Sequence, residues 1–275
     1  MNRKVIKVVK GQRAIDGEGV HLVRVLGPDT IDDFDPFLML DSFDSTNPSD
    51  YTKGFPMHPH RGIETVTYLV KGEIDHRDSL GNRGKITDGE SQWMTAGSGI
   101  LHEEMPRPSE RMLGYQLWIN LPKVDKMTEP NYFDINDSVY AIHSEDDFTV
   151  KVLSGKYDDT VGAEVKYIQA TIYDINLNPN VELEIPTKSG ENVFVFLLEG
   201  DGIIDGIKYD EKSAILFGNG DSIKISSTEN KKLNFGFFSA PRLNERVAWG
   251  GPIVMNTRDE LNQAFRDLEN GTFIK

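Results

Sequence analysis

Residues 54–82 read GFPMHPHRGIETVTYLVKGEIDHRDSLGN, a run in which short apolar segments alternate with glycine. Residues 63–70 (IETVTYLV) are rich in β-branched and aromatic residues over the length of one strand, and Lys71-Gly72 begins a turn. Farther along the chain, residues 113–121 (LGYQLWINL) form another strand-like run. Short strands separated by glycine turns predict an all-β fold and are typical of sandwiches and jelly-roll barrels.

A second block of the same kind spans residues 148–240. Residues 192–206 (NVFVFLLEGDGIIDG) are similar to residues 63–76, because both place an apolar strand, a glycine turn and a second apolar pair in that order. This similarity indicates an internal duplication. We therefore predict two tandem jelly-roll β-barrels, in domains of residues 1–125 and 126–275, with residues 122–137 as a linker.

One helix is predicted near the end of the chain. Thr257 and Glu260 have the spacing of a capping box, in which each side chain satisfies a backbone N–H of the first turn. Leu261, Phe265 and Leu268 follow at helical spacing and form an apolar stripe. We expect this helix to pack against a barrel.

Three of the six histidines form two tight groups that predict a metal site. His58 and His60 are two residues apart, so on a strand both imidazoles point to the same side. His102 and Glu104 share a side for the same reason, whereas Glu103 points away. Two neighbouring strands would bring these three imidazoles and the Glu104 carboxylate to one cation. Such ligands suit Fe(II), Zn, Mn, Ni or Cu.

Composition excludes several classes of function. The chain has no cysteine, which excludes disulfides, thiolate nucleophiles and cysteine-ligated metals, so any metal must be held by His, Asp or Glu. The net charge of -14 repels phosphate, so we expect no direct nucleic acid binding. We see neither a signal peptide nor a membrane-spanning run, and we therefore expect no membrane partner and a cytoplasmic location.

The histidine motifs resemble those of the cupins, in which H-x-H is followed by a glutamate and later by G-x-x-H. Here His58 and His60 are followed by Glu64, which therefore competes with Glu104 as a ligand, and residues 99–102 read GILH. Four longer stretches closely resemble the pirin family of cupins, and together they extend over almost the whole chain. They are residues 16–43, 54–82, 92–106 and 247–257.

The resemblance implies that His58, His60, His102 and Glu104 hold one divalent metal, for which Fe(II) is expected and Zn, Mn, Ni or Cu are alternatives. It places Glu64 outside the ligand set. It also implies that both domains are cupin barrels, of which only the first holds a metal. The second block has no histidine after His143 and carries Asn192-Val193-Phe194 where H-x-H is expected.

The resemblance further implies a dioxygenase of the quercetin 2,3-dioxygenase type, which uses O₂ on a flavonol or another enolic substrate. In that reading Glu104 is catalytic and removes the substrate's hydroxyl proton as a general base. The alternative, which eukaryotic pirins suggest, is a metal- or redox-sensing binding protein that acts through a partner protein as a transcriptional co-regulator. A third hypothesis, a sugar isomerase, lacks a cluster of basic residues to grip a phosphate. We expect His76 to lie beside a turn, outside the site.

Overall fold

The computed structural model describes all residues, 1–275, and contains 26 β-strands, two α-helices and three short 3-10 helices. The predicted all-β fold with a C-terminal helix is therefore confirmed. The chain forms two compact units. The first unit comprises residues 13–31, 35–136 and 243–275, and the second comprises residues 1–12, 32–34 and 137–242.

The first unit is built from two sheets. The larger has seven strands in the order β12 (Asn131–Ile135), β9 (Ser91–Thr95), β6 (Ile63–Lys71), β11 (Met112–Asn120), β4 (Phe37–Ser45), β3 (Val20–Leu26) and β2 (Gln12–Asp16). The smaller has four strands in the order β5 (Phe55–His60), β10 (Ile100–Pro106), β7 (Ile74–Asp78) and β8 (Arg83–Ile86). Buried residues of both sheets, among them Leu69 and Ile74, pack into one core cluster.

The second unit repeats this arrangement. Its seven-stranded sheet has the order β1 (Val5–Lys10), β22 (Ser213–Phe217), β19 (Glu191–Glu199), β24 (Leu233–Pro241), β17 (Thr171–Leu177), β14 (Phe148–Ser154) and β13 (Ala141–Ser144). Its four-stranded sheet has the order β18 (Glu182–Pro186), β23 (Ser222–Ser227), β20 (Gly202–Ile204) and β21 (Ile207–Tyr209). A single aliphatic and aromatic cluster fills the space between these two sheets.

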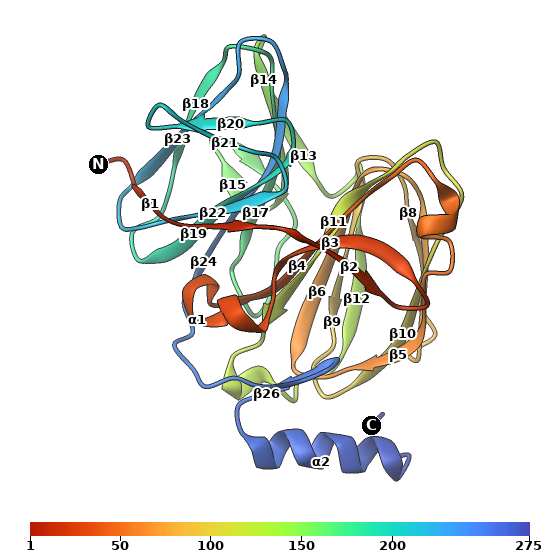
Figure 1. Cartoon of the computed structure of the whole chain (residues 1–275). Helices are drawn as coiled ribbons and strands as arrows, with labels where there is room; N and C mark the ends of the chain where they lie inside the picture. Colours follow the sequence, from red (N-terminus) through yellow and green to blue (C-terminus); the bar gives the residue numbers. More distant parts are fainter. The chain divides into compact units, whose positions relative to one another are not determined.

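The two units match strand by strand. Each strand from β2 to β11 of the first unit has a counterpart in the second, taken in chain order, once the short β15–β16 hairpin (Lys156–Tyr157 and Thr160–Val161) is set aside. The edge strand β12 corresponds to β1, which comes from the start of the chain and pairs with β22 (Figure 1). This shared order supports an internal duplication, completed in the second unit by the N-terminal strand.

The predicted linker and the predicted division of the chain differ in part from the structure. Residues 122–137 were predicted to be a linker, but residues 131–135 form β12 and pair with β9 because Ile135 is buried in the barrel. Residues 1–12 belong to the second unit and residues 243–275 to the first, so neither unit is continuous in sequence. A boundary between residues 125 and 126 stays a prediction.

The C-terminal helix α2 (Arg258–Glu269) begins at the predicted capping box. The Thr257 hydroxyl accepts the N–H of Glu260 at 3.2 Å, and the Glu260 carboxylate accepts the N–H of Thr257 at 2.8 Å. Leu261 and Ala264 are buried against the strand pair β25 (Ala248–Gly250) and β26 (Ile253–Met255). The predicted stripe was wrong for Phe265, which is 38% exposed.

Arg61 joins the C-terminal segment to the end of β5. Its side chain is buried, and it donates to the carbonyl of Ser98 at 2.7 Å, to the Asp267 carboxylate at 2.7 Å and to the carbonyl of Phe273 at 3.0 Å. The guanidinium also lies 4.1 Å from the centre of the Phe273 ring. Since every contact is charge-assisted or buried, Arg61 fixes the backbone directly after His60.

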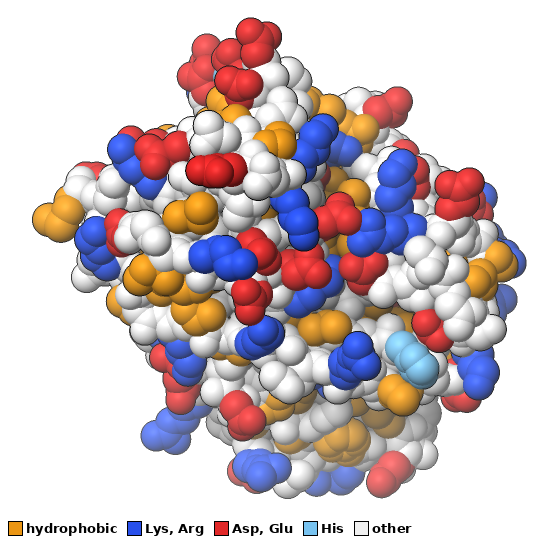
Figure 2. Space-filling model, turned by 45° about the horizontal axis from the view of Figure 1, so that its top comes forward, with side chains coloured by type: hydrophobic (Ala, Val, Ile, Leu, Met, Phe, Trp, Pro, Cys, Tyr) orange, Lys and Arg blue, Asp and Glu red, His pale blue; other side chains and the backbone are white.

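The remaining short elements complete the surface. They are α1 (Ile31–Phe34) and the 3-10 helices Pro28–Thr30, Pro48–Asp50 and Lys123–Asp125. Neither α-helix has the length and apolar character required to cross a bilayer. On the face shown in Figure 2, basic and acidic side chains are interspersed.

Candidate metal centre

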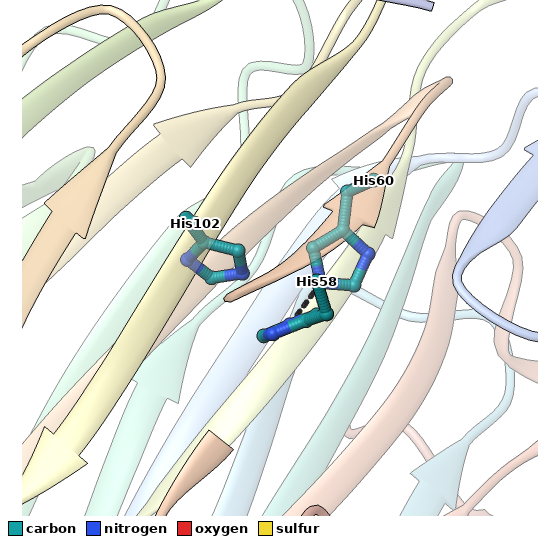
Figure 3. A group of neighbouring side chains, drawn as sticks. All are labelled: His58, His60 and His102. Atoms are coloured by element: carbon teal, nitrogen blue, oxygen red, sulfur yellow. Dashed lines mark hydrogen bonds between the residues drawn. The ribbon is translucent and has the colours of Figure 1, made fainter. Parts of the chain in front are cut away.

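The structure brings His58, His60 and His102 together. His58 and His60 come from β5 and His102 from β10, and these two strands are antiparallel neighbours in which His102 pairs with His58. One ring nitrogen from each histidine lies within 4.8 Å of the others. Figure 3 shows the three imidazoles close to one another. The three histidines therefore lie together as the sequence predicts.

Backbone carbonyls orient two of the rings. The Nδ1 atom of His58 lies 2.8 Å from the carbonyl oxygen of Pro56, and Nδ1 of His60 lies 3.0 Å from that of Pro252. A carbonyl can only accept, so each Nδ1 carries the proton and each Nε2 presents a lone pair. This is the usual way in which a metal-binding histidine is oriented.

The unsatisfied nitrogens fit a cation. The Nε2 atoms of His58 and His60 lie 3.0 Å apart, although both present lone pairs in the neutral rings. Both ring nitrogens of His102 are buried without any hydrogen-bond partner. Buried polar atoms are nearly always satisfied, and a divalent metal bound by the three imidazoles would take up one nitrogen of each ring, including one of the two unpartnered nitrogens of His102.

Burial keeps two of the three histidines neutral. Desolvation, and then the neighbouring His58, lower the pKa of His60 to about 3. Desolvation, with smaller contributions from His60, His58 and His76, lowers the pKa of His102 well below its usual value. A metal binds the neutral imidazole, so these rings need not lose a proton at neutral pH before binding.

Glu104 is buried on β10 but lies outside the group of three histidines. Oε1 accepts hydrogen bonds from the Thr67 hydroxyl at 2.8 Å and from the Gln92 amide, and Oε2 accepts one from the Gln116 amide. Three donors therefore hold the carboxylate in the barrel interior. Its roles as fourth ligand and as base stay predictions.

Glu103 and Glu64, the two other glutamates near the histidine motifs, have different surroundings from Glu104. Glu103 forms an ion pair with Arg77 at 3.0 Å on the side of β10 away from the histidines. Glu64 is buried on β6, where Oε1 accepts a hydrogen bond from Thr95 at 2.7 Å and Oε2 has no partner. Desolvation raises the pKa of Glu64 to about 7. Glu64 is not part of the histidine group.

His76 is the residue that sequence reasoning misplaced. It lies within β7 and not beside an exposed turn, and its side chain is fully buried. Nε2 lies 3.2 Å from the Asp78 carboxylate, and the ring stacks on Tyr132 with centroids 4.0 Å apart. The alternation of His76 and Asp78 could have revealed this strand. The missing information was its pairing with β10, where His76 lies opposite Glu104.

An open cleft of about 650 Å³ leads to His58 and His60. Trp118 and Trp249 form its aromatic wall, with ring centroids 5.8 Å apart. Its polar wall contains Arg24, whose guanidinium pairs with Asp16 and Asp41 at 2.7 Å each. Phe55 also lines the cleft.

Two jelly-roll barrels of equivalent topology in one chain, one of them with clustered imidazoles, define a bicupin. Residues 19–119 match the family Pirin, and residues 172–274 match the Pirin C-terminal cupin domain. The chain therefore belongs to the pirin family. This confirms the resemblance on which the cupin assignment of both barrels was based.

Three relatives show how far the similarity extends. A pirin-like protein of Caulobacter vibrioides is 39% identical over 275 residues, covering 98% of this chain and 99% of that protein. Human pirin is 37% identical over 278 residues, and the alignment covers 98% of this chain and 93% of human pirin. The crystal structure of a quercetin 2,3-dioxygenase from Acinetobacter baumannii superposes with a TM-score of 0.90 at 30% identity and covers 99% of both chains.

Proposed function

We propose that this protein is a metal-dependent oxidoreductase of the quercetin 2,3-dioxygenase type, acting with O₂ on a flavonol or another planar enolic substrate. The observation that carries the proposal is the cluster of three imidazoles whose free nitrogens converge at the end of an open cleft. The name of the Acinetobacter baumannii structure supports the same reaction class. Fe(II) is the proposed metal, and the imidazole set also accepts Zn, Mn, Ni or Cu.

His58, His60 and His102 would hold the metal, with Glu104 as the proposed fourth ligand. When bound, Fe(II) supplies Lewis-acid and redox chemistry at the enolic oxygen of the substrate. The protein itself would position the substrate. Trp118 and Trp249 offer a flat apolar wall for an aromatic ring, and a ring packed against this wall would have water excluded from that face.

Glu104 is the proposed base for the enolic hydroxyl. Glu104 does not itself line the cleft, but Gln116 does, and its amide donates to Oε2 of Glu104. A substrate hydroxyl that takes the place of Gln116 would meet an acceptor fixed by Thr67 and Gln92. Proton removal by a positioned base contributes about 10²- to 10⁴-fold in rate.

The test is O₂ consumption with a flavonol, measured per bound metal in Fe(II)-loaded protein. We expect uptake by the wild type, and at least a hundredfold lower uptake per metal by Glu104→Gln, about the smallest contribution of such a base. Equal uptake per metal by the two proteins would exclude Glu104 as the base. No uptake by the wild type with several flavonols, at full Fe(II) occupancy, would instead favour the metal-sensing binding protein.

A further inference from the structure

The second unit has a cavity at the place where the first unit has its cleft. In the first unit the cleft is bounded by the paired strands β4 and β11, whose counterparts in the second unit are β17 and β24. A pocket of about 280 Å³ opens beside β17 and β24, next to the end of β18. Its lining residues on these two strands are cross-strand pairs, Thr171 with Ser239 and Tyr173 with Phe237.

The same comparison shows what replaces the histidines. The histidine strands β5 and β10 correspond to β18 and β23. The sequence-based match of H-x-H to residues 192–194 was therefore wrong, because these residues lie in β19, the counterpart of β6. The inward positions of β18 and β23 are aliphatic and buried in the core. They are Leu183, Ile185, Ile223 and Ile225.

The pocket therefore keeps its walls but has no metal ligands at the positions equivalent to the histidines. Tyr173 and Phe237 form one wall, where their rings stack with centroids 5.1 Å apart and an interplanar angle of 15°. The Tyr173 hydroxyl donates to the carbonyl of Lys156, which fixes the ring in place. Such a wall suits a planar ring, which packs by offset stacking or by its edge.

The charges that line the pocket favour an anion. Lys156 and Lys188 face it together with a single carboxylate, that of Glu191, in a chain whose net charge is -14. The Glu191 carboxylate is already engaged, since it accepts the Ser239 hydroxyl at 2.5 Å and lies 3.5 Å from Lys188. Lys156 has only Asp159, a fully solvated partner at 3.6 Å. An incoming anion would therefore find Lys156 available.

A buried arginine stiffens the rim. Arg3 donates to the Thr187 hydroxyl at 2.7 Å and to the carbonyls of Lys188 and Glu191 at 2.7 and 3.1 Å. Arg3 has little solvent exposure, so its charge adds to the positive potential behind this wall. The loop that carries Lys188 and Glu191 is thus fixed before any ligand arrives, which lowers the entropic cost of binding.

From these features we infer that the second barrel is a binding site for a small aromatic carboxylate, independent of the metal centre. The volume of about 280 Å³ is slightly below the range of roughly 300–1,000 Å³ for pockets that hold drug-sized ligands, so a single ring fits best. The ring would lie against Tyr173 and Phe237, and the carboxylate would pair with Lys156 and Lys188.

The probe is benzoate, titrated into isotope-labelled full-length protein and followed by amide chemical shifts. We expect saturable shifts centred on Thr171 and Ser239, with a Kd on the order of 1 mM for so small a ligand. Benzamide, which has the same shape without the charge, should bind at least tenfold more weakly. Equal binding of benzamide, or benzoate shifts confined to β4 and β11, would overturn the inference.

Charge-reversal variants test the lysines without disturbing the core. Lys156→Glu combined with Lys188→Glu should weaken benzoate binding at least tenfold. Lys231→Glu, at an exposed lysine of the same unit outside the pocket, should not. Removing the metal with a chelator should leave benzoate binding unchanged, which separates this site from the proposed function. Wild-type affinity in the double variant would refute the assignment, provided that both variants melt at the wild-type temperature.

Discussion

His58 and His60 present their Nε2 atoms to each other at a distance of 3.0 Å, while backbone carbonyls hold both Nδ1 protons. Two lone pairs at this distance repel each other unless a cation lies between or beside them. The carbonyl that orients His60 belongs to Pro252, in the C-terminal segment that Arg61 anchors. The geometry of the site thus depends on residues far away in the sequence.

Removal of one imidazole should abolish metal retention. His58→Ala or His102→Ala leaves two imidazoles, and we expect the metal content after dialysis to fall below a tenth of the wild-type value. Elemental analysis of the purified variants measures this, with circular dichroism to show that they are folded. Stoichiometric metal in His102→Ala would mean that the metal lies elsewhere.

Glu103→Gln is the matched control for the acidic residues of β10. Its side chain pairs with Arg77 away from the histidines, so the variant should keep the wild-type metal content. Glu104→Gln should keep part of the metal through the three imidazoles. If Glu103→Gln lost as much metal as Glu104→Gln, the orientation of β10 would be wrong.

Metal binding should stabilise the first unit. A ligand that binds only the folded state at one hundred times its Kd adds about 2.7 kcal/mol to the free energy of unfolding. We therefore expect the melting temperature of metal-free protein to rise when Fe(II), Ni or Zn is added, and to stay unchanged in His102→Ala. A rise of the same size in His102→Ala would place the stabilising metal at another site.

Glu64 should make the stability of the first unit depend on pH. Its folded-state pKa is raised from 4.5 to about 7 by burial, so the unfolded state ionises first and stability falls as pH rises through this window. The full effect is on the order of 3 kcal/mol. Urea unfolding measured at several pH values between about 4.5 and 7 gives the free energy of unfolding, which should fall in the wild type but not in Glu64→Gln. If the same fall occurred in Glu64→Gln, another group would be responsible for it.

Local patterns were sufficient to predict the helix start and which neighbouring side chains of β5 and of β10 share a face; that β5 and β10 are neighbours is a long-range pairing that these patterns do not specify. His58, His60 and His102 lie on strands, where alternation alone decides which side chains share a face. Thr257 and Glu260 satisfy each other's backbone, so their capping box needs no distant partner. These features depend on residues within one or two turns or strand positions of each other.

The features that sequence reasoning missed depend on pairing between distant segments. β1 pairs with β22, more than two hundred residues away, and nothing in residues 5–10 specifies that partner. His76 is buried because β7 pairs with β10, and Phe265 is exposed because α2 packs through Ala264. The burial of each depends on a partner that local alternation does not reveal.

The most direct test of the metal centre is anomalous diffraction from crystals of the protein loaded with Fe(II), collected on both sides of the iron absorption edge. We predict one anomalous peak per chain, about 2.0–2.3 Å from a ring nitrogen of each of His58, His60 and His102. The same map would show whether a Glu104 oxygen completes the set. A peak away from the three imidazoles, or none in iron-loaded crystals that consume O₂ with a flavonol, would contradict this account.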